Sequence, residues 1–188
     1  MEVTSVPSFL DYWKKVRGRT RRVADCIPDE RLEWTWKAGD PTTRGRTSAV
    51  GNAGTPRAYF TLGDLVRHLA GIERYMYAEN VQGLPSRYAG HGRELADGPA
   101  AVREFLERCH AESLAIFAGL TDERLREKCE TPAGASISVG KWLRLMIEHE
   151  IHHRGQLYMA LGILGVETPP IYGLTSEQVR SRSIPDRP

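Results

Sequence analysis

Apolar residues recur at helical spacing in four segments of the chain, and the clearest of these segments lies toward the C-terminal end. The stretch from Ser138 to Leu161 contains no proline, and at about 100° per residue its inward positions fall on one stripe. Gly165 is the expected end of this helix, because glycine readily takes the left-handed conformation that terminates helices. The stripe consists of Trp142, Leu145, Met146, His149, His153, Gln156, Leu157, Ala160 and Leu164.

Three further helices are predicted before this one, at about Ser8 to Ile27, Thr61 to Val81 and Pro99 to Leu120. No run of alternating strand residues appears, and residues 121–137 form a segment of acidic and basic residues that is expected to end in a turn. The pattern therefore predicts an all-α protein, a four-helix bundle whose order is up-and-down or contains one long crossover.

Local signals set the expected ends of these helices. Ser8 is a suitable N-cap for the first helix, and Pro28 stops it. Thr61 can cap the second helix, where Asp64 suits the positive helix end. The inward positions expected of the second helix are Leu62, Leu65, Leu69, Ile72 and Met76, with His68 at the margin of the stripe.

The connections are long, and the whole chain, residues 1–188, is expected to form one domain. Residues 37–58 are rich in Gly, Thr, Arg and Pro without periodicity, which is typical of a mobile surface insertion. Residues 83–99 are also irregular, and His91 within them has no evident partner. Residues 166–188 form a C-terminal tail, in which the sequence Thr175 to Gln178 predicts a capping box for one short closing helix.

Two histidines interrupt the apolar stripe of the last helix. His149 and His153 stand where a bundle usually places leucine, and a buried imidazole without a partner costs a few kcal/mol. Hydrogen bonds to carboxylates or water, an open cleft, or a shared metal ion would each remove that cost. Spacing of four residues places the two side chains roughly 5–6 Å apart at Cβ, which also suits neighbouring positions around zinc or nickel.

Composition excludes several classes of function. The chain is 40% hydrophobic and 27% charged, with a net charge of +2 and arginines interleaved with acids, which is typical of a solvated surface. This charge does not favour binding to nucleic acid or to a membrane surface. Neither a membrane-spanning segment nor a signal peptide is apparent. Three widely spaced cysteines indicate no disulfide framework, and Cys109 is expected to be a buried thiol. We expect a cytoplasmic protein.

Two separate stretches of the sequence resemble the DinB family, the DinB/YfiT-like group of metalloenzymes. The first is Thr61-Leu62-Gly63-Asp64-Leu65-Val66-Arg67-His68-Leu69-Ala70, and the second is His149-Glu150-Ile151-His152-His153-Arg154-Gly155-Gln156-Leu157. The helix spacing and the stretch from Pro28 to Trp36 are also similar to this family. The resemblance covers the chain apart from the polar insertion at residues 42–56.

The resemblance implies a bundle of the DinB/YfiT-like type that holds a divalent metal ion, commonly nickel or zinc, through three histidines. The ligands map onto His68, His149 and His153. His152 points about 80° away from the middle of the pair, so we assign it to a hydrogen bond outside the ligand set. The candidates for a catalytic role near the site are Gln156, Glu150 and Arg154, and Gln156 is expected to face inward.

Three neutral ligands leave a position for water or substrate, as in catalytic metal sites. The wider superfamily includes transferases and isomerases that use mycothiol, bacillithiol or glutathione. The resemblance therefore implies a thiol-dependent S-transferase or isomerase that acts on a small electrophile, with a low-molecular-weight thiol as a second cofactor.

Two other functions remain open from the sequence. The string from His149 to His153 matches H-E-x-x-H, in which Glu150 would be the general base of a metal-dependent hydrolase. No third histidine follows at the spacing of the metzincin proteases. A non-catalytic metal-binding or stress-related helical bundle would have the same pattern.

The expected partners are a small-molecule substrate and a second copy of the chain. Large apolar residues near helix ends, which a bundle of this length does not obviously cover, motivate the homodimer. These residues are Trp13, Trp34, Trp36 and Trp142.

Overall fold

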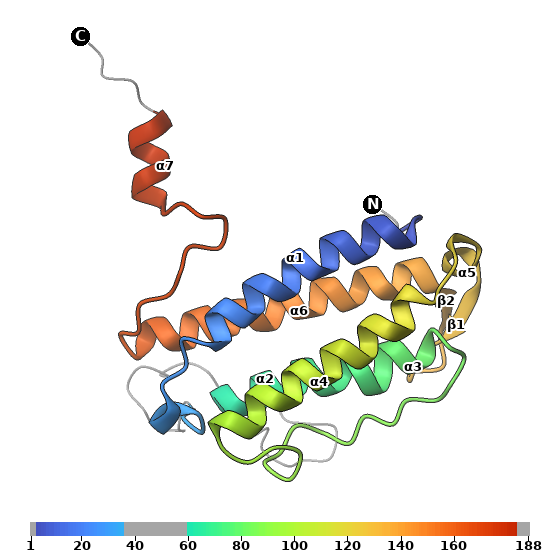
Figure 1. Cartoon of the computed structure of the whole chain (residues 1–188), viewed down its shortest axis with the longest axis horizontal. Helices are drawn as coiled ribbons and strands as arrows, with labels where there is room; N and C mark the ends of the chain where they lie inside the picture. The colour runs from blue at the N-terminus through green and yellow to red at the C-terminus, as the bar shows by residue number, and fades with distance from the viewer. Residues whose placement is uncertain (1–2, 36–59, 184–188) are drawn as a thin grey trace.

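The computed structural model describes residues 3–35 and 60–183, and within them four long helical segments form a bundle (Figure 1). Helix α1 (Val6–Ala24) packs against α6 (Val139–Ile163) and α4 (Pro99–Ala118). Helix α2 (Leu62–Ile72) packs against α4 and α6, and it continues through the π-helical segment η3 (Glu73–Tyr77) into α3 (Ala78–Asn80). The predicted all-α bundle is confirmed.

The bundle contains the long crossover that the sequence left open. Helices α2 and α4 run in the same direction, opposite to α1 and α6 (Figure 1). The connection between α3 and α4 returns along the bundle beside η3, where the backbone N–H of Arg87 donates to the carbonyl of Tyr75 at 2.8 Å. The predicted insertion at residues 37–58, and Trp36, lie outside the described residues.

The first predicted helix is wrong at both ends. Helix α1 begins at Val6 after Ser5 and ends at Ala24, so Ser8 lies inside the helix rather than at its cap. Pro7 explains the earlier start, because proline fits the first turn of a helix, where no backbone N–H is needed. A short 3₁₀ turn, η1 (Asp29–Arg31), follows.

The remaining helix ends agree with the sequence. Thr61 and Asp64 form a capping box at α2, with side-chain to backbone distances of 2.9 and 3.0 Å. Gly165 has a φ of +72° just after α6, as a helix terminator should. The closing helix α7 (Ser176–Ser183) begins with the expected capping box and buries none of its residues.

Residues 121–138 contain more regular structure than predicted. Helix α5 (Asp122–Arg126) is followed by the antiparallel hairpin of β1 (Lys128–Glu130) and β2 (Ser136–Ser138), in which Cys129 pairs with Ile137. Strands of three residues are too short to show alternation in the sequence. The hairpin leads directly into α6, whose N-cap Ser138 accepts a hydrogen bond from the backbone of Lys141 at 3.3 Å.

The π-helical segment changes which face of the second helix is buried. Leu62, Leu65 and Leu69 are buried as predicted, but Ile72 and Met76 are only half-buried, and Glu73 and Tyr77 take the inward positions. A π turn takes one more residue per hydrogen-bonded ring than an α turn, so the residues after it rotate relative to the α-helical pattern.

Two apolar clusters fill the bundle, and a layer of polar residues separates them. The first cluster includes Val23, Leu69, Phe105 and Leu157, and the second includes Trp13, Tyr77, Phe117 and Leu143. Every long helix contributes buried polar residues between the two clusters. These residues are Arg17, Thr20, His68, Glu73, His110, Ser113, Glu150, His153 and Arg154.

Part of this polar layer is a network of buried charges that the sequence analysis placed on the surface. Arg17 is 1% exposed and forms ion pairs with Glu73 and, at 3.3 Å, with Glu150. Trp13 donates to Glu73 at 3.2 Å, and Thr20 donates to Glu150 at 2.6 Å. The expectation that the arginines form a solvated surface is therefore wrong for Arg17, and likewise for Arg67 and Arg154.

Two of the tryptophans that motivated the homodimer are covered within a single chain. Trp13 and Trp142 are 0% and 7% exposed, and Trp34 is half-buried against the first apolar cluster. Trp13 and Trp142 therefore leave little apolar surface for a partner to cover. The homodimer stays a prediction. None of the helices in the described parts of the chain is long and apolar enough to span a membrane.

Candidate metal centre

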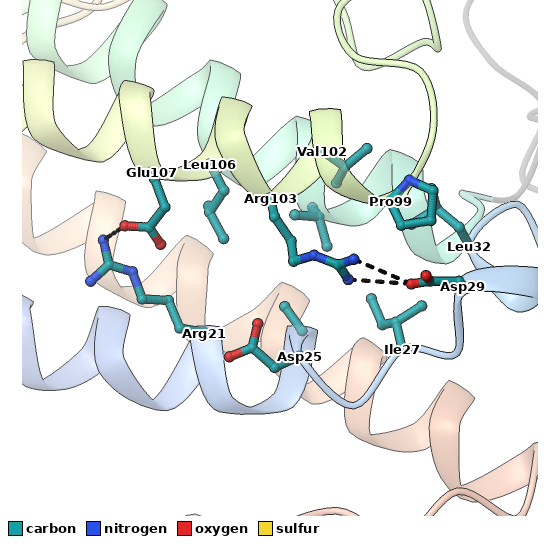
Figure 2. Close-up of a pocket in the computed structure, with 12 residues that line it drawn as sticks. Arg21, Asp25, Ile27, Asp29, Leu32, Pro99, Val102, Arg103, Leu106 and Glu107 are labelled. Carbon is teal, nitrogen blue, oxygen red and sulfur yellow. Dashed lines mark hydrogen bonds and ion pairs between the residues drawn. The ribbon is translucent and has the colours of Figure 1, made fainter.

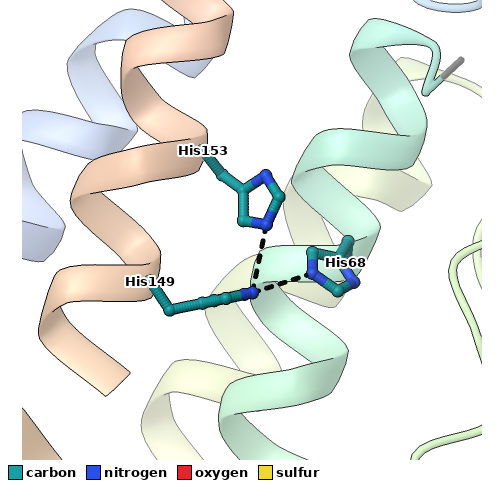
Figure 3. Close-up of side chains that lie close together, drawn as sticks. All are labelled: His68, His149 and His153. Atoms are coloured by element: carbon teal, nitrogen blue, oxygen red, sulfur yellow. Dashed lines mark hydrogen bonds between the residues drawn. The ribbon is translucent and has the colours of Figure 1, made fainter. Parts of the chain in front are cut away.

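Three histidines from two helices meet in the polar layer. His68 projects from α2, and His149 and His153 project from successive turns of α6 toward it (Figure 3). Nε2 of His149 lies 3.0 Å from Nε2 of His68 and 3.0 Å from Nε2 of His153. The structure thus brings together the three residues that the resemblance assigned as ligands.

The spacing of the three nitrogens fits one metal ion. Their candidate ligand atoms all lie within 4.8 Å of one another. Zinc–imidazole bonds are about 2.0–2.1 Å long, so two ligands on one ion are roughly 2.9–3.4 Å apart at octahedral or tetrahedral angles. The 3.0 Å separations lie within that range.

A hydrogen bond on its far nitrogen orients His153. Its Nδ1 lies 2.7 Å from Oε1 of Gln156, and an amide oxygen only accepts, so Nδ1 carries the proton. In the neutral ring Nε2 therefore presents a lone pair to the cluster. The amide nitrogen of Gln156 in turn donates to Nε2 of His152 at 3.1 Å, which gives His152 the role outside the ligand set that its rotation suggested.

A second support for the cluster comes from the connection between α3 and α4. Oη of Tyr88 lies 2.6 Å from Nδ1 of His68 and 3.3 Å from Nδ1 of His91. One hydroxyl can donate to His91 and accept from His68, which leaves a lone pair on Nε2 of His68. No partner for His91 was evident from the sequence, but its ring packs on Phe60 with centroids 4.3 Å apart.

These hydrogen bonds make the arrangement difficult to satisfy without a cation. The Nε2 lone pairs of His68 and His153 both face Nε2 of His149, and a neutral imidazole nitrogen donates at most one proton. His149 can therefore satisfy only one of the two neighbours. A cation at the meeting point would accept all three lone pairs, as metal ions bound by histidine do.

Burial keeps the histidines in the form that binds metal. Burial is the main cause that lowers the pKa of His68 to about 3, and charge repulsion from the neighbouring His153 and His149 adds to the shift. Burial is likewise the main cause that lowers the pKa of His149 to about 4, and charge repulsion from His153 and His152 adds to it. The pKa of His153 is also lowered, mainly by burial. All three imidazoles are therefore neutral at pH 7, and only the neutral ring is a ligand.

These lowered pKa values predict that the metal-free protein loses stability in mild acid. An unfolded histidine has a pKa of about 6.5, so below that pH the unfolded chain takes up protons that the folded cluster excludes. The free energy of unfolding should thus have its full value well above pH 6.5, and it should fall as the pH drops from 6.5 toward 4 and 3, where the folded His149 and His68 themselves take up protons. Guanidinium titrations at several pH values, with chelator present, would measure this slope.

The unfolding free energy should depend less steeply on pH in His68→Leu, because this variant lacks one of the histidines whose pKa is lowered. Between pH 6.5 and 5, carboxylates with ordinary pKa values contribute little to the slope. Burial raises the pKa of Glu150, and protonation of this residue in the folded state would oppose the slope. Equal stability of the metal-free protein at pH 7 and pH 5 would contradict the expected burial of neutral histidines.

The supports of the cluster should matter less than the ligands themselves. Tyr88→Phe and Gln156→Leu each remove the hydrogen-bond partner of an Nδ1 atom, and the loss of such partners typically weakens metal binding about 10–100-fold. Calorimetric titration with Zn²⁺ or Ni²⁺ would test this range. Affinity unchanged in both variants would mean that these hydrogen bonds do not orient the rings.

Glu150 and Arg154 lie on the other side of α6. The carboxylate of Glu150 accepts from Thr20 and pairs with Arg17, both on α1, and it is 2% exposed. The guanidinium of Arg154 donates to the carbonyl of Val16 at 3.1 Å. Of the three residues named as catalytic candidates, only Gln156 has a hydrogen bond to a member of the histidine cluster.

The class of protein is thus an all-α bundle with a three-histidine cluster held between two helices. Residues 12–157 match the model of the DinB superfamily, so the chain belongs to this superfamily. The match covers most of the four predicted helices and the whole histidine cluster, and it confirms the resemblance seen in the sequence. No curated protein matches the chain.

Solved structures show the same fold. The chain is similar to a DinB-like protein from Bacillus cereus ATCC 10987, with 16% identity, a TM-score of 0.62 and coverage of 89% of this chain and 98% of that one. A DinB-like protein from Bacillus subtilis gives 18% identity and a TM-score of 0.64, with 89% and 99% covered. The mycothiol-dependent maleylpyruvate isomerase gives 13% identity and a TM-score of 0.55, with 81% of this chain and 60% of that protein covered.

Proposed function

We propose that the protein binds one divalent ion, nickel or zinc, through His68, His149 and His153, and transfers a low-molecular-weight thiol to a small electrophile. The observation that carries the metal is the convergence of three Nε2 atoms, of which that of His153 is fixed as an acceptor by Gln156 and that of His68 can be an acceptor when Tyr88 accepts from its Nδ1. The thiol rests on likeness of fold to a protein that uses mycothiol. A bound divalent ion would supply Lewis acidity, which lowers the pKa of an adjacent thiol.

The protein's own cysteines favour an external thiol. Burial raises the pKa of Cys109 to about 12, and burial also raises the pKa of Cys26 and Cys129. All three are free thiols. At neutral pH their thiolate fraction, and with it their reactivity as nucleophiles, is therefore small. A nucleophilic sulfur would have to come from a bound small molecule.

The residues around the cluster suit an apolar or aromatic electrophile. The ring of Phe60 lies against His68 and His153, with centroids 5.2 and 5.9 Å apart. Tyr77 packs on Trp142 at 4.5 Å and lies 6.1 Å from the ring of His149. Aromatic side chains of this kind exclude water and contact apolar substrates.

The direct test is an assay of metal-loaded protein with mycothiol, bacillithiol and glutathione, each with 1-chloro-2,4-dinitrobenzene as acceptor. In this substitution an S–C bond forms, the C–Cl bond breaks, chloride leaves and the thiol proton passes to solvent. We expect turnover with at least one thiol that disappears with chelator and returns with added metal. Stoichiometric metal without turnover on any acceptor tested would favour the non-catalytic bundle instead.

One substitution separates the transferase from the hydrolase. Glu150 would have to leave Thr20 and Arg17 before it could act as the general base of an H-E-x-x-H enzyme. We expect Glu150→Gln to keep the metal and to change thiol transfer by less than about 10-fold, because general-base loss typically costs 10²–10⁴-fold. Hydrolysis of a peptide substrate by the metal-loaded protein that is lost in Glu150→Gln, with metal and helical circular dichroism retained, would support the hydrolase.

A further inference from the structure

A cavity of about 170 Å³ lies between the C-terminal end of α1, the η1 turn, α2 and α4 (Figure 2). None of its lining residues belongs to the histidine cluster, and none is hydrogen-bonded to it. Five of its twelve lining residues are charged, and the other seven are apolar. The apolar residues include Ala24, Ile27, Leu32, Val66, Val102 and Leu106.

The cavity is large enough for a small ring. Val66, Val102 and Leu106 are at most 4% exposed, so its floor belongs to the buried core. Apolar cavities of about 150 Å³ hold no water and bind molecules such as benzene, because the walls otherwise lack contact partners. The size and the walls therefore favour an apolar body of about six to eight heavy atoms.

Two ion pairs flank the opening. Arg21 of α1 pairs with Glu107 of α4, and Arg103 of α4 pairs with Asp29 of η1 at 3.3 Å (Figure 2). The side chains of Arg103 and Asp29 are 51% and 66% exposed. Exposed pairs contribute only about 0–1 kcal/mol, so these side chains can move aside for a ligand at little cost.

A carboxylate without a counter-ion lies between the two pairs. Asp25 lines the cavity, and within residues 3–35 and 60–183 its side chain has neither a hydrogen bond nor an ion pair (Figure 2). The opening thus carries three carboxylates against two guanidinium groups, and the uncompensated charge is that of Asp25. This excess favours a positively charged group at the mouth.

We propose that this cavity is a second ligand site, which binds a small aromatic or branched aliphatic amine with its apolar body inside and its ammonium group at Asp25. The proposal does not depend on the metal site or on thiol transfer. The two sites can be tested separately, because no residue is shared between them.

Benzylamine is the probe, with toluene and benzoate as the neutral and anionic comparisons. We expect benzylamine to bind the full-length protein with a Kd on the order of 1 mM or below, since small ligands gain limited free energy per atom. Methyl NMR should show shifts at Ile27, Leu32 and Val102 that saturate with the ligand. Toluene should shift the same methyls, and benzoate should bind more weakly than benzylamine.

Three variants define the site. Ala24→Leu fills the cavity and should abolish the shifts at Ile27 and Leu32, and Val102→Phe repeats this block from the opposite helix. Asp25→Asn should weaken benzylamine about 2–5-fold, in line with an exposed ion pair, without affecting toluene. His68→Ala should leave benzylamine binding intact, so loss of the metal site and loss of this site remain distinguishable.

Several results would overturn the proposal. The first is that benzylamine shifts only the NMR signals of exposed methyl groups, such as those of Ile151 and Ile163. The second is that both Ala24→Leu and Val102→Phe still bind benzylamine with unchanged affinity, although circular dichroism shows that they are folded. The third is that benzoate binds more tightly than benzylamine, which would show that the opening prefers an anionic group.

Discussion

Replacement of His149 by alanine is expected to weaken Zn²⁺ and Ni²⁺ binding by more than about 100-fold, which exceeds the usual effect of removing a hydrogen-bond partner of a ligand. His149 is the central member of the cluster, since its Nε2 lies 3.0 Å from both of the others. Its loss leaves two ligands on opposite helices. Elemental analysis of protein purified without a histidine tag, together with calorimetric titration, would measure the change.

The fold should survive this substitution, because His149 is only half-buried and has no ion pair in the described part of the chain. His152→Ala is the matched control on the same helix. His152 contacts Gln156 rather than the cluster, so its loss should change affinity by less than about 10-fold. Full metal stoichiometry after His68→Ala and His149→Ala together would place the site elsewhere.

Replacement of Arg17 by methionine is expected to lower the free energy of unfolding by about 3–5 kcal/mol, the usual cost of breaking a buried ion pair from one side. Arg17 is the ion-pair partner of both Glu73 and Glu150, and all three are at most 2% exposed. Burial raises the pKa of Glu73, but Arg17 and His110 outweigh that effect and hold it below its usual value. Without Arg17, Glu73 would be a buried carboxylate with little compensation.

Guanidinium denaturation of the metal-free protein, followed by circular dichroism, would measure this loss. Arg22→Met on the same helix is the control, and this exposed position should change stability by less than about 0.5 kcal/mol. Adding Glu73→Gln and Glu150→Gln to Arg17→Met should restore much of the loss, because no unpaired carboxylate remains. A loss below 1 kcal/mol in Arg17→Met alone would show that water reaches the network.

The sequence was sufficient to predict the bundle and the pair His149 and His153, because both depend on helical periodicity. His149 and His153 interrupt an apolar stripe, and a side chain that breaks a stripe marks a polar site from the sequence alone. His68 needed the family resemblance, since it lies at the margin of its stripe. Its position became meaningful only with the packing of α2 against α6.

The supports of the cluster could not be predicted in the same way. Tyr88 and His91 lie in an irregular connection, where no periodicity relates a residue to the core. Glu150 was assigned to the neighbourhood of the metal because of its place in a motif. In the helix it is about 100° from His149, which turns it toward α1.

The buried network was missed for a different reason. Arg17 follows Trp13 by four residues, so it lies on the apolar face of α1, and that position was a usable signal. Glu73 gave no such signal. Its inward direction depends on the π-helical segment, which the sequence pattern does not reveal.

The π-helical segment also sets the angular phase between the two ends of the second helix. In an uninterrupted α-helix, residues nine apart point in nearly opposite directions, so His68 and Tyr77 could not both turn toward α6. The segment from Glu73 to Tyr77 takes up part of that rotation, and both rings lie near His149. The number of residues between His68 and Tyr77 is therefore as strongly constrained as their identity, and a single insertion or deletion there would turn one of these rings away from α6.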